Sequence, residues 1–177
     1  WSISSNSDLF TILKKTIQYT KMEYVSDFSY VERALVVAGS YKTVGTNSVE
    51  TFPHNWPVSP VWTSIWLQRR LTQFGYSTVD TAFFYSGNMN TTNPTIQNSW
   101  NDGVGVINYR GWGNAQGWVK PQFFSSPDVF NLSSTWDLPV VFSFVCNTGD
   151  FGNDVEPSFG ESLIRAGSHL GGGKGAV

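Results

Sequence analysis

Two apolar runs decide the fold of this chain: Gly103-Val-Gly-Val-Ile-Asn-Tyr109 and Leu138-Pro-Val-Val-Phe-Ser-Phe-Val145. Both are rich in β-branched and aromatic residues, which favour strands, and both break off into small and polar residues. We therefore expect two buried strands of a sheet that is covered on both faces.

A glycine-containing loop follows each of these strands. Arg110-Gly-Trp-Gly-Asn-Ala-Gln-Gly-Trp118 comes after the first strand, and Cys146-Asn-Thr-Gly-Asp-Phe151 comes after the second. In an open parallel sheet, the carboxyl ends of neighbouring strands form the crevice in which ligands bind. The two loops therefore mark the functional face, and the only cysteine of the chain lies on it.

Helices and strands alternate along the rest of the chain. The apolar spacing predicts helices over residues 7–24, 59–74, 94–101 and 157–166, and strands over residues 31–39 and 76–85. Residues 41–59 read as a long irregular loop, and such loops are often functional. The alternation predicts an α/β fold with a mainly parallel sheet.

The length of the chain and its two ends indicate its domain organisation. The chain has 177 residues, enough for one full hydrophobic core, and we expect a single domain over residues 1–177. It begins without a methionine and ends where a further strand is expected to start. The chain therefore has the features of a fragment, with other domains of a longer protein as its neighbours.

Composition disfavours several classes of partner. Charged residues make up 14% of the chain, the formal net charge is −2 and no run of Lys or Arg is present, so nucleic acid is not an expected partner. No apolar run has the length of a membrane span. Few Lys and Glu beside abundant Asn, Ser, Thr, Trp and Tyr are typical of secreted or cell-surface proteins.

Cys146 has more than one interpretation. A lone cysteine excludes an internal disulfide and leaves a buried structural thiol, a reactive thiol or an intermolecular bridge. Free cysteines are often buried and behave as small hydrophobic residues. A thiol at the end of a buried strand can instead lie where main-chain amides stabilise a developing oxyanion.

Two segments resemble the gingipain-like cysteine peptidases. Cys146-Asn-Thr-Gly-Asp-Phe151 and Pro157-Ser-Phe-Gly-Glu-Ser-Leu-Ile-Arg165 are similar to the region of that family's catalytic cysteine. The family's histidine loop is matched by Asn108-Tyr109, Gly113, Trp118 and Pro121. The resemblance implies a caspase-like fold, a three-layer α/β sandwich with a mostly parallel sheet, and peptide-bond cleavage by a His and Cys dyad.

The sequence departs from this family's pattern at Trp112. The resemblance implies a catalytic histidine at this position, with Cys146 as the nucleophile and Gly113 as a candidate for the oxyanion amide. An indole has one N–H donor and no basic nitrogen, so it cannot take the thiol proton. A nucleophile and its base act as a unit, and their separation removes most of the rate enhancement.

Two histidines are present that could supply a base instead. His54 lies in the long loop after the first strand, which leaves from the same end of the sheet as Cys146, and a plain surface histidine is its alternative interpretation. His169 lies at the end of the last helix, where it suits the helix dipole. His54 is therefore the alternative base.

The polar side chains of the cysteine loop have two alternative interpretations, one of which is a metal site. Asp150, Asn153 and Asp154 supply the hard oxygen atoms that Ca²⁺ prefers. The alternative is a polar surface loop with an Asx turn at Asn153. Apart from this structural Ca²⁺, no cofactor is expected.

Tryptophan residues gather around the predicted crevice. Trp118 and Trp56 are candidates for stacking on a substrate, since an indole on a binding face stacks on sugars or apolar side chains. Trp62 and Trp66 lie about one helical turn apart and are expected in the core.

Three hypotheses follow. The chain is a gingipain-like cysteine peptidase domain whose base is displaced, a non-catalytic domain that binds a peptide, a glycan or a protein, or a purely structural domain. The Trp112 substitution favours a pseudoenzyme mechanistically, and a peptide or protein is the expected ligand.

Overall fold

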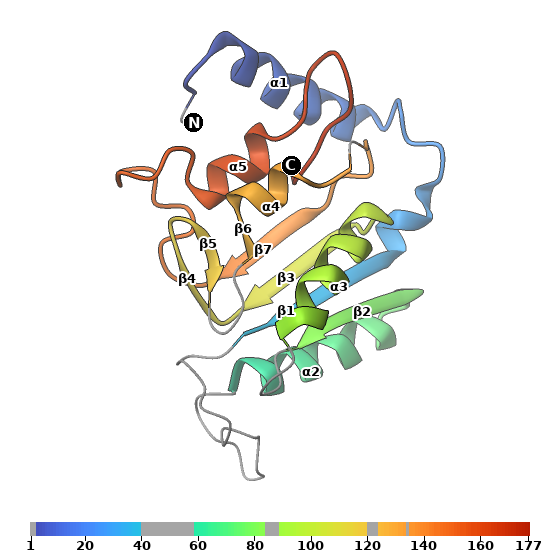
Figure 1. Ribbon diagram of the computed structural model, residues 1–177. Coiled ribbons are helices and arrows are strands. Elements are labelled where there is room, and N and C mark those ends of the chain that lie inside the picture. Colours follow the sequence, from blue (N-terminus) through green and yellow to red (C-terminus); the bar gives the residue numbers. More distant parts are fainter. Residues whose placement is uncertain (1–2, 40–58, 84–88, 120–123, 134) are drawn as a thin grey trace.

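The centre of the molecule is a four-stranded parallel sheet (Figure 1). This computed structural model describes residues 3–39, 59–83, 89–119, 124–133 and 135–177. The strands are β1 (Arg33–Ala38), β2 (Thr78–Phe83), β3 (Val106–Arg110) and β7 (Val140–Phe144). Their order is β2-β1-β3-β7, and every neighbouring pair is parallel. The mainly parallel sheet predicted from the sequence is confirmed.

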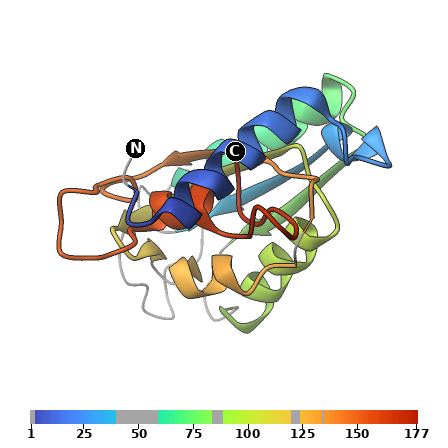
Figure 2. The same ribbon diagram turned by 90° about the horizontal axis from the view of Figure 1, so that it is seen from above.

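Helices cover both sides of this sheet. They are α1 (Asn6–Lys21), the 3-10 helix η1 (Phe28–Glu32), α2 (Ser59–Gln73), α3 (Met89–Asn101), α4 (Ser126–Phe130) and α5 (Phe159–Arg165). Figure 2 shows α2 on one side of the sheet and α3 and α4 on the other. The result is the three-layer α/β sandwich that was expected.

Aromatic side chains fill the space between the sheet and α3, α4 and α5. Trp118 stacks on Tyr109, with 4.4 Å between ring centroids. Trp118 also packs against Phe124 and Phe159, at 5.7 and 5.2 Å. Trp100 of α3 stacks on Phe124 and is 2% exposed, as expected for the inward side of that helix. We call this side of the sheet the closed face.

A small antiparallel sheet lies between β3 and α4. It consists of β4 (Trp112–Asn114), β5 (Gly117–Val119) and β6 (Phe124–Ser125), in the order β4-β5-β6. A tight turn joins β4 to β5, and the Gln116 N–H donates to the side-chain oxygen of Asn114 at 2.9 Å. The predicted glycine-rich loop is thus partly a sheet, because strands of two or three residues are too short to show an alternating pattern.

β7 departs from the prediction that both of its faces are covered. It is an edge strand, and Phe142 and Phe144 are 47% and 58% exposed. Their rings stack on one another, with centroids 6.2 Å apart. Val141 and Val145 point the other way and pack against the core. The covered-strand prediction is therefore wrong for β7, whose Phe-Ser-Phe sequence alternates between an open and a closed side.

Some helix boundaries differ from the predicted ones. α1 ends at Lys21 rather than at residue 24, because Met22 adopts a left-handed conformation (φ 54°) that ends the helix. α3 begins at Met89, ahead of the predicted start at Pro94, which lies inside the helix. α2 spans Ser59–Gln73, close to its predicted range.

A buried lysine ties α1 to the rest of the molecule. Lys15 is 2% exposed, and its ammonium donates hydrogen bonds of 2.6 to 3.3 Å to the carbonyl groups of Leu163, Ile164, Ala166 and Lys174. Most of these carbonyls belong to the end of α5, the negative end of that helix dipole. Burial lowers the pKa of Lys15 to about 7, and the four acceptors oppose this shift because they favour the ammonium form.

Candidate active site

Trp112 and Cys146 follow the carboxyl ends of neighbouring strands. In the parallel pair of β3 and β7, Arg110 lies opposite Phe144 at the last position of the register. Trp112 and Cys146 each come two residues later in the sequence, and neighbouring strands are about 4.8 Å apart. The prediction that both residues lie at the ends of adjacent strands is confirmed.

Gly113 brings the two loops into contact. A Cβ atom at this position would lie 2.8 Å from Cγ2 of Val145 and 2.9 Å from Cγ2 of Thr148. These separations are shorter than normal carbon contacts, so the absence of a side chain allows β4 to approach the cysteine loop this closely. The Trp112-Gly113 segment therefore packs directly against the residues on either side of Cys146.

The cysteine loop is a hydrogen-bonded turn. Asn147 adopts a left-handed conformation (φ 60°), which Asn tolerates better than most residues. The Asp150 N–H donates to the Asn147 carbonyl at 3.2 Å. The Thr148 hydroxyl lies 3.2 Å from that of Ser143, which accepts a 2.9 Å hydrogen bond from Nε1 of Trp118. The loop is thus anchored to the closed face.

The start of α5 joins both loops. The N–H groups of Phe159 and Gly160 donate to the carbonyls of Ala115 and Thr148, each at 2.7 Å. Glu161 accepts the main-chain N–H of the N-cap residue at 2.7 Å and so supports the first turn of its own helix. One helix end therefore holds the turn of the β4 and β5 hairpin and the cysteine loop in a common frame.

The thiol of this site is accessible. Cys146 is an exposed free cysteine, and Trp112 in the facing loop is 43% exposed. The interpretation of Cys146 as a buried structural thiol is therefore wrong. A reactive thiol and an intermolecular bridge are the two interpretations that remain.

One protein family matches this sequence over its whole length. The matching family is described as peptidase family C25, and the match covers residues 1–177. The chain belongs to peptidase family C25. It is a gingipain-like peptidase domain, as the cysteine and histidine loop motifs indicated.

Gingipains are among the relatives of this C25 domain. The chain is 27% identical over 166 residues to gingipain R2 of Porphyromonas gingivalis strain W83, and 26% identical over 166 residues to gingipain R1 of the same species. The matches cover 94% of this chain but 20% and 15% of those two proteins. The chain therefore spans about a fifth or less of the length of these curated relatives.

Solved gingipain structures share the fold of this C25 domain. The Arg-specific cysteine proteinase gingipain R superposes with a TM-score of 0.74 and 24% identity, over 99% of this chain and 37% of that one. A complex of the pro- and mature domains of RgpB from Porphyromonas gingivalis gives a TM-score of 0.75 and 26% identity, over 99% of this chain and 38% of that one. The caspase-like fold implied by the resemblance is confirmed.

Trp118 does not line the crevice of this C25 domain. It is 2% exposed and surrounded by the rings of the closed face, so the prediction that it stacks on a substrate is wrong. The core prediction is wrong for Trp66, which is 59% exposed. Trp62 is only partly buried. Trp56 lies outside the described residues.

Of the two histidines, only His169 lies among the described residues. His54 lies outside the described residues, so its role as an alternative base stays a prediction. His169 follows α5, which ends at Arg165, and its ring packs against that of Phe10 in α1 at 5.6 Å. The ammonium of Lys15, rather than His169, meets the carbonyls at the end of α5.

The acidic loop forms Asx turns. Oδ1 of Asp150 accepts the Gly152 N–H at 3.1 Å, and Oδ1 of Asn153 accepts the Val155 N–H at 2.6 Å. Over the described ranges, no group of three or more His, Cys, Asp and Glu side chains is placed to hold a metal ion. Two of the three predicted ligand side chains thus already bond to main-chain amides, and Ca²⁺ at Asp150, Asn153 and Asp154 stays a prediction.

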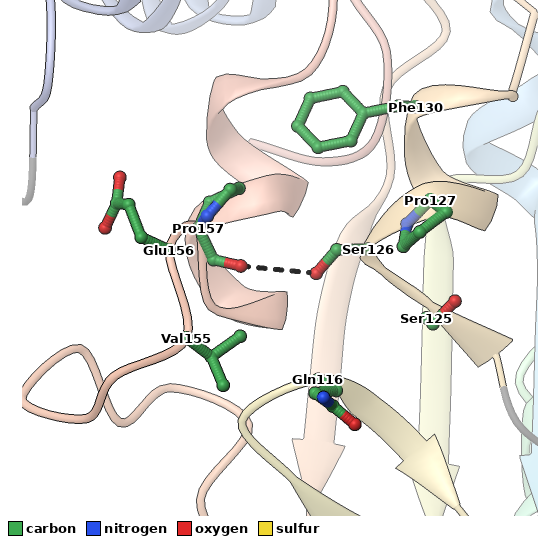
Figure 3. A pocket seen from close by; sticks show the side chains of 8 residues that line it. All are labelled: Gln116, Ser125, Ser126, Pro127, Phe130, Val155, Glu156 and Pro157. Atoms are coloured by element: carbon green, nitrogen blue, oxygen red, sulfur yellow. Dashed lines mark hydrogen bonds between the residues drawn. The ribbon is translucent and has the colours of Figure 1, made fainter.

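A pocket with a volume of about 370 Å³ lies between α4 and the segment that precedes α5 (Figure 3). The Ser126 hydroxyl donates to the Pro157 carbonyl across it at 3.5 Å. Its walls are formed by Gln116, Ser125, Ser126, Pro127, Phe130, Val155, Glu156 and Pro157, a set that includes neither Cys146 nor Trp112.

Among the residues that the structure describes, no helix combines the length and the hydrophobicity needed to cross a membrane.

Proposed function

We propose that this gingipain-like domain binds a peptide or protein segment at the Cys146 edge of its sheet without hydrolysing it efficiently. The observation that carries the proposal is that the exposed Cys146 and Trp112 follow the ends of adjacent strands. At this position the family resemblance calls for the imidazole of the dyad, and an indole has no basic nitrogen. The proposed result is a peptidase-like site that lacks its general base.

Each part of the proposed site has a separate role. The Cys146 thiol keeps the position of the nucleophile, and the Gly113 amide is the candidate donor to the carbonyl oxygen of a bound peptide. Peptide cleavage needs a base to take the thiol proton and an acid to return it to the leaving amine, and Trp112 can do neither. Binding and orientation of a peptide require no such proton transfer.

A second candidate function is an active cysteine peptidase whose base comes from another part of the protein. The accessible thiol of Cys146 favours it, because a residue with only a packing role would be buried. His54 would be the base within this chain. In this case the thiol would attack the scissile carbonyl, the amine would leave with the proton held by the base, and water would release the acyl group.

Hydrolysis of a mixed peptide library separates the two functions. The full-length protein, a Trp112→His variant and a Cys146→Ala blank would be compared. We expect no cleavage by the unmodified protein above the blank. We also expect low cleavage by Trp112→His, because a catalytic imidazole needs a second group to fix its orientation. Cleavage by the unmodified protein that disappears in the blank would favour the active peptidase.

Iodoacetamide labelling of native protein is an independent measurement on the same thiol. We expect Cys146 to react at about the rate of a free, exposed thiol, since it is exposed and the position of the family's imidazole holds the indole of Trp112. Labelling well above that rate, reduced by His54→Ala, would instead identify His54 as the base.

We also propose a location for the domain. It would act at the cell surface or outside the cell, together with other domains of a longer chain. The composition and the family membership support this location. The solved complex of the pro- and mature domains of RgpB is a protein–protein complex of a relative, and it supports a protein segment as the ligand class.

A further inference from the structure

A pocket of about 310 Å³ opens beside the active-site edge, on the side of the sheet opposite the closed face. Asn108 and Arg110 of β3 and Phe144 of β7 are among its lining residues. Arg110 and Phe144 are register partners, and each precedes Trp112 or Cys146 by two residues. The pocket therefore lies where a side chain of a peptide held at the thiol would reach.

The remaining lining comes from α2. Trp66 and Leu67 supply apolar surface, and Thr63 and Ser64 supply hydroxyl groups. Trp66 is 59% exposed, so its indole is available at the rim of the pocket. A volume near 300 Å³ is at the lower end of the range for small-ligand sites and is ample for one amino-acid side chain.

Two donors in this pocket have no acceptor among the described residues. The Ser64 hydroxyl is buried, its residue being 2% exposed, and it makes no hydrogen bond. The buried Nε of Arg110 also makes none. A buried donor without a partner is destabilising, and more so when the group is charged. Both donors would be satisfied by a ligand that brings oxygen acceptors.

Among the described residues, the charged side chain that lines the pocket is that of Arg110, and no carboxylate lines it. The guanidinium of Arg70 lies 5.5 Å from the centroid of the Trp66 ring and adds a second positive charge near the rim. A planar guanidinium matches the geometry of a carboxylate, which accepts two parallel N–H bonds.

We infer that this pocket selects a peptide ligand with an acidic side chain, Asp or Glu, at the position nearest the thiol. The guanidinium of Arg110 pairs with the carboxylate, the Ser64 hydroxyl donates to it, and Trp66 and Phe144 enclose the methylene groups. This inference rests on the proposed peptide-binding function and adds its ligand class. The same pocket rejects Lys and Arg side chains, since a cation would lie beside Arg110 without a counter-ion.

Peptide binding to the full-length protein tests the inference. Fluorescent peptides that differ only by Glu, Gln or Lys at one position are titrated into the Cys146→Ala protein, which prevents any turnover. We expect the Glu peptide to bind about tenfold to a hundredfold more tightly than the Gln peptide. Arg110→Gln should remove this preference, and Arg110→Glu should shift it toward the Lys peptide.

Arg33→Gln is the matched control. It removes the same charge from the first residue of β1, at the opposite end of the sheet, where Arg33 donates to the Asp102 carbonyl at 2.8 Å. The Glu preference should persist in this variant. Equal affinity for the Glu and Gln peptides in the Cys146→Ala protein with both arginines intact, or loss of the preference in both arginine variants, would overturn the inference.

Two further readouts separate this inference from the proposed function. If the unmodified protein cleaves peptides and prefers Glu, the non-catalytic function is wrong and the acidic pocket stands. If no peptide binds, N-acetylglutamate amide is added and the NMR signal of the Arg110 Nε–H is followed, with N-acetylglutamine amide as the control. A saturable shift with the acid alone supports the pocket without peptide binding, and no shift refutes it.

Discussion

The two faces of β3 differ in what they contact. On one face, Ile107 and Tyr109 are at most 3% exposed and pack among the rings of the core. On the other face, Asn108 and Arg110 line a pocket. The same contrast continues in β7, where Val141 is packed inward and Phe144 is 58% exposed. The two faces share their backbone, so any difference in their roles comes from alternate side chains.

The closed face stabilises the fold, whereas the opposite side of the sheet, which we call the open face, is the candidate surface for recognition. The closed face holds the cysteine loop through the Ser143 and Thr148 hydroxyls and through contacts with Gly113. The open face presents unsatisfied donors and exposed rings next to the same loop. Changes on the closed face should therefore alter folding, and changes on the open face should alter binding while the fold persists.

The largest expected effect is that of Trp118→Ala. Removing this buried indole leaves a cavity among Tyr109, Phe124 and Phe159, and the free energy of unfolding should fall by about 3 to 5 kcal/mol. Trp66→Ala on the open face should change it by only about 0.5 kcal/mol. Urea unfolding of both variants measures the difference, and similar losses would show that the two faces contribute equally.

Gly113→Ala should have an intermediate effect. The new methyl group would meet Val145 and Thr148 below 3 Å, so overpacking should cost about 1 to 3 kcal/mol and displace the cysteine loop. Gly149→Ala is the control in the same loop, because no atom lies within 4 Å of its added Cβ. The unfolding free energy and the labelling rate of Cys146 are measured together. Unchanged values in Gly113→Ala would mean that the loops separate without cost.

The smallest effect is expected from exchanging Phe142 and Phe144 for Ser. Both rings are largely exposed, so the unfolding free energy should change by about 0.5 kcal/mol, while self-association at the edge of the sheet should decrease. Val141→Ser, on the packed side of the same strand, should be clearly more destabilising. Analytical ultracentrifugation and urea unfolding test both statements. A large stability loss in the Phe variant would show that this face is covered.

The strands and most helices could be predicted because their signals are local. The apolar run of residues 34–38 and the apolar spacing after Ser59 each indicate one element type, and the structure has β1 and α2 there. The very short β4, β5 and β6 leave no alternation to recognise. The exposed face of β7 was missed because a Val-Val-Phe-Ser-Phe run can belong to a central strand or to an edge strand.

Part of the candidate site could also be predicted from local signals in the sequence. Strand ends and motif spacing placed Cys146, Trp112 and Gly113 together. The sequence does not show which way a tryptophan beside a glycine-rich loop points, and Trp118 turned out to belong to the core. Arg110 was not singled out, because only the tertiary structure places it beside Ser64 and Phe144.

The hydrogen bonds of Lys15 make this residue a chemical reporter on the docking of α1. Acylating reagents need an accessible amine, so Lys15 is protected as long as its ammonium faces the four carbonyls. Its modification would therefore record the moments at which α1 detaches from α5. An acetylated Lys15 would carry no charge and would keep a single N–H donor for the four carbonyls, so a helix modified while detached could not dock again in the same way.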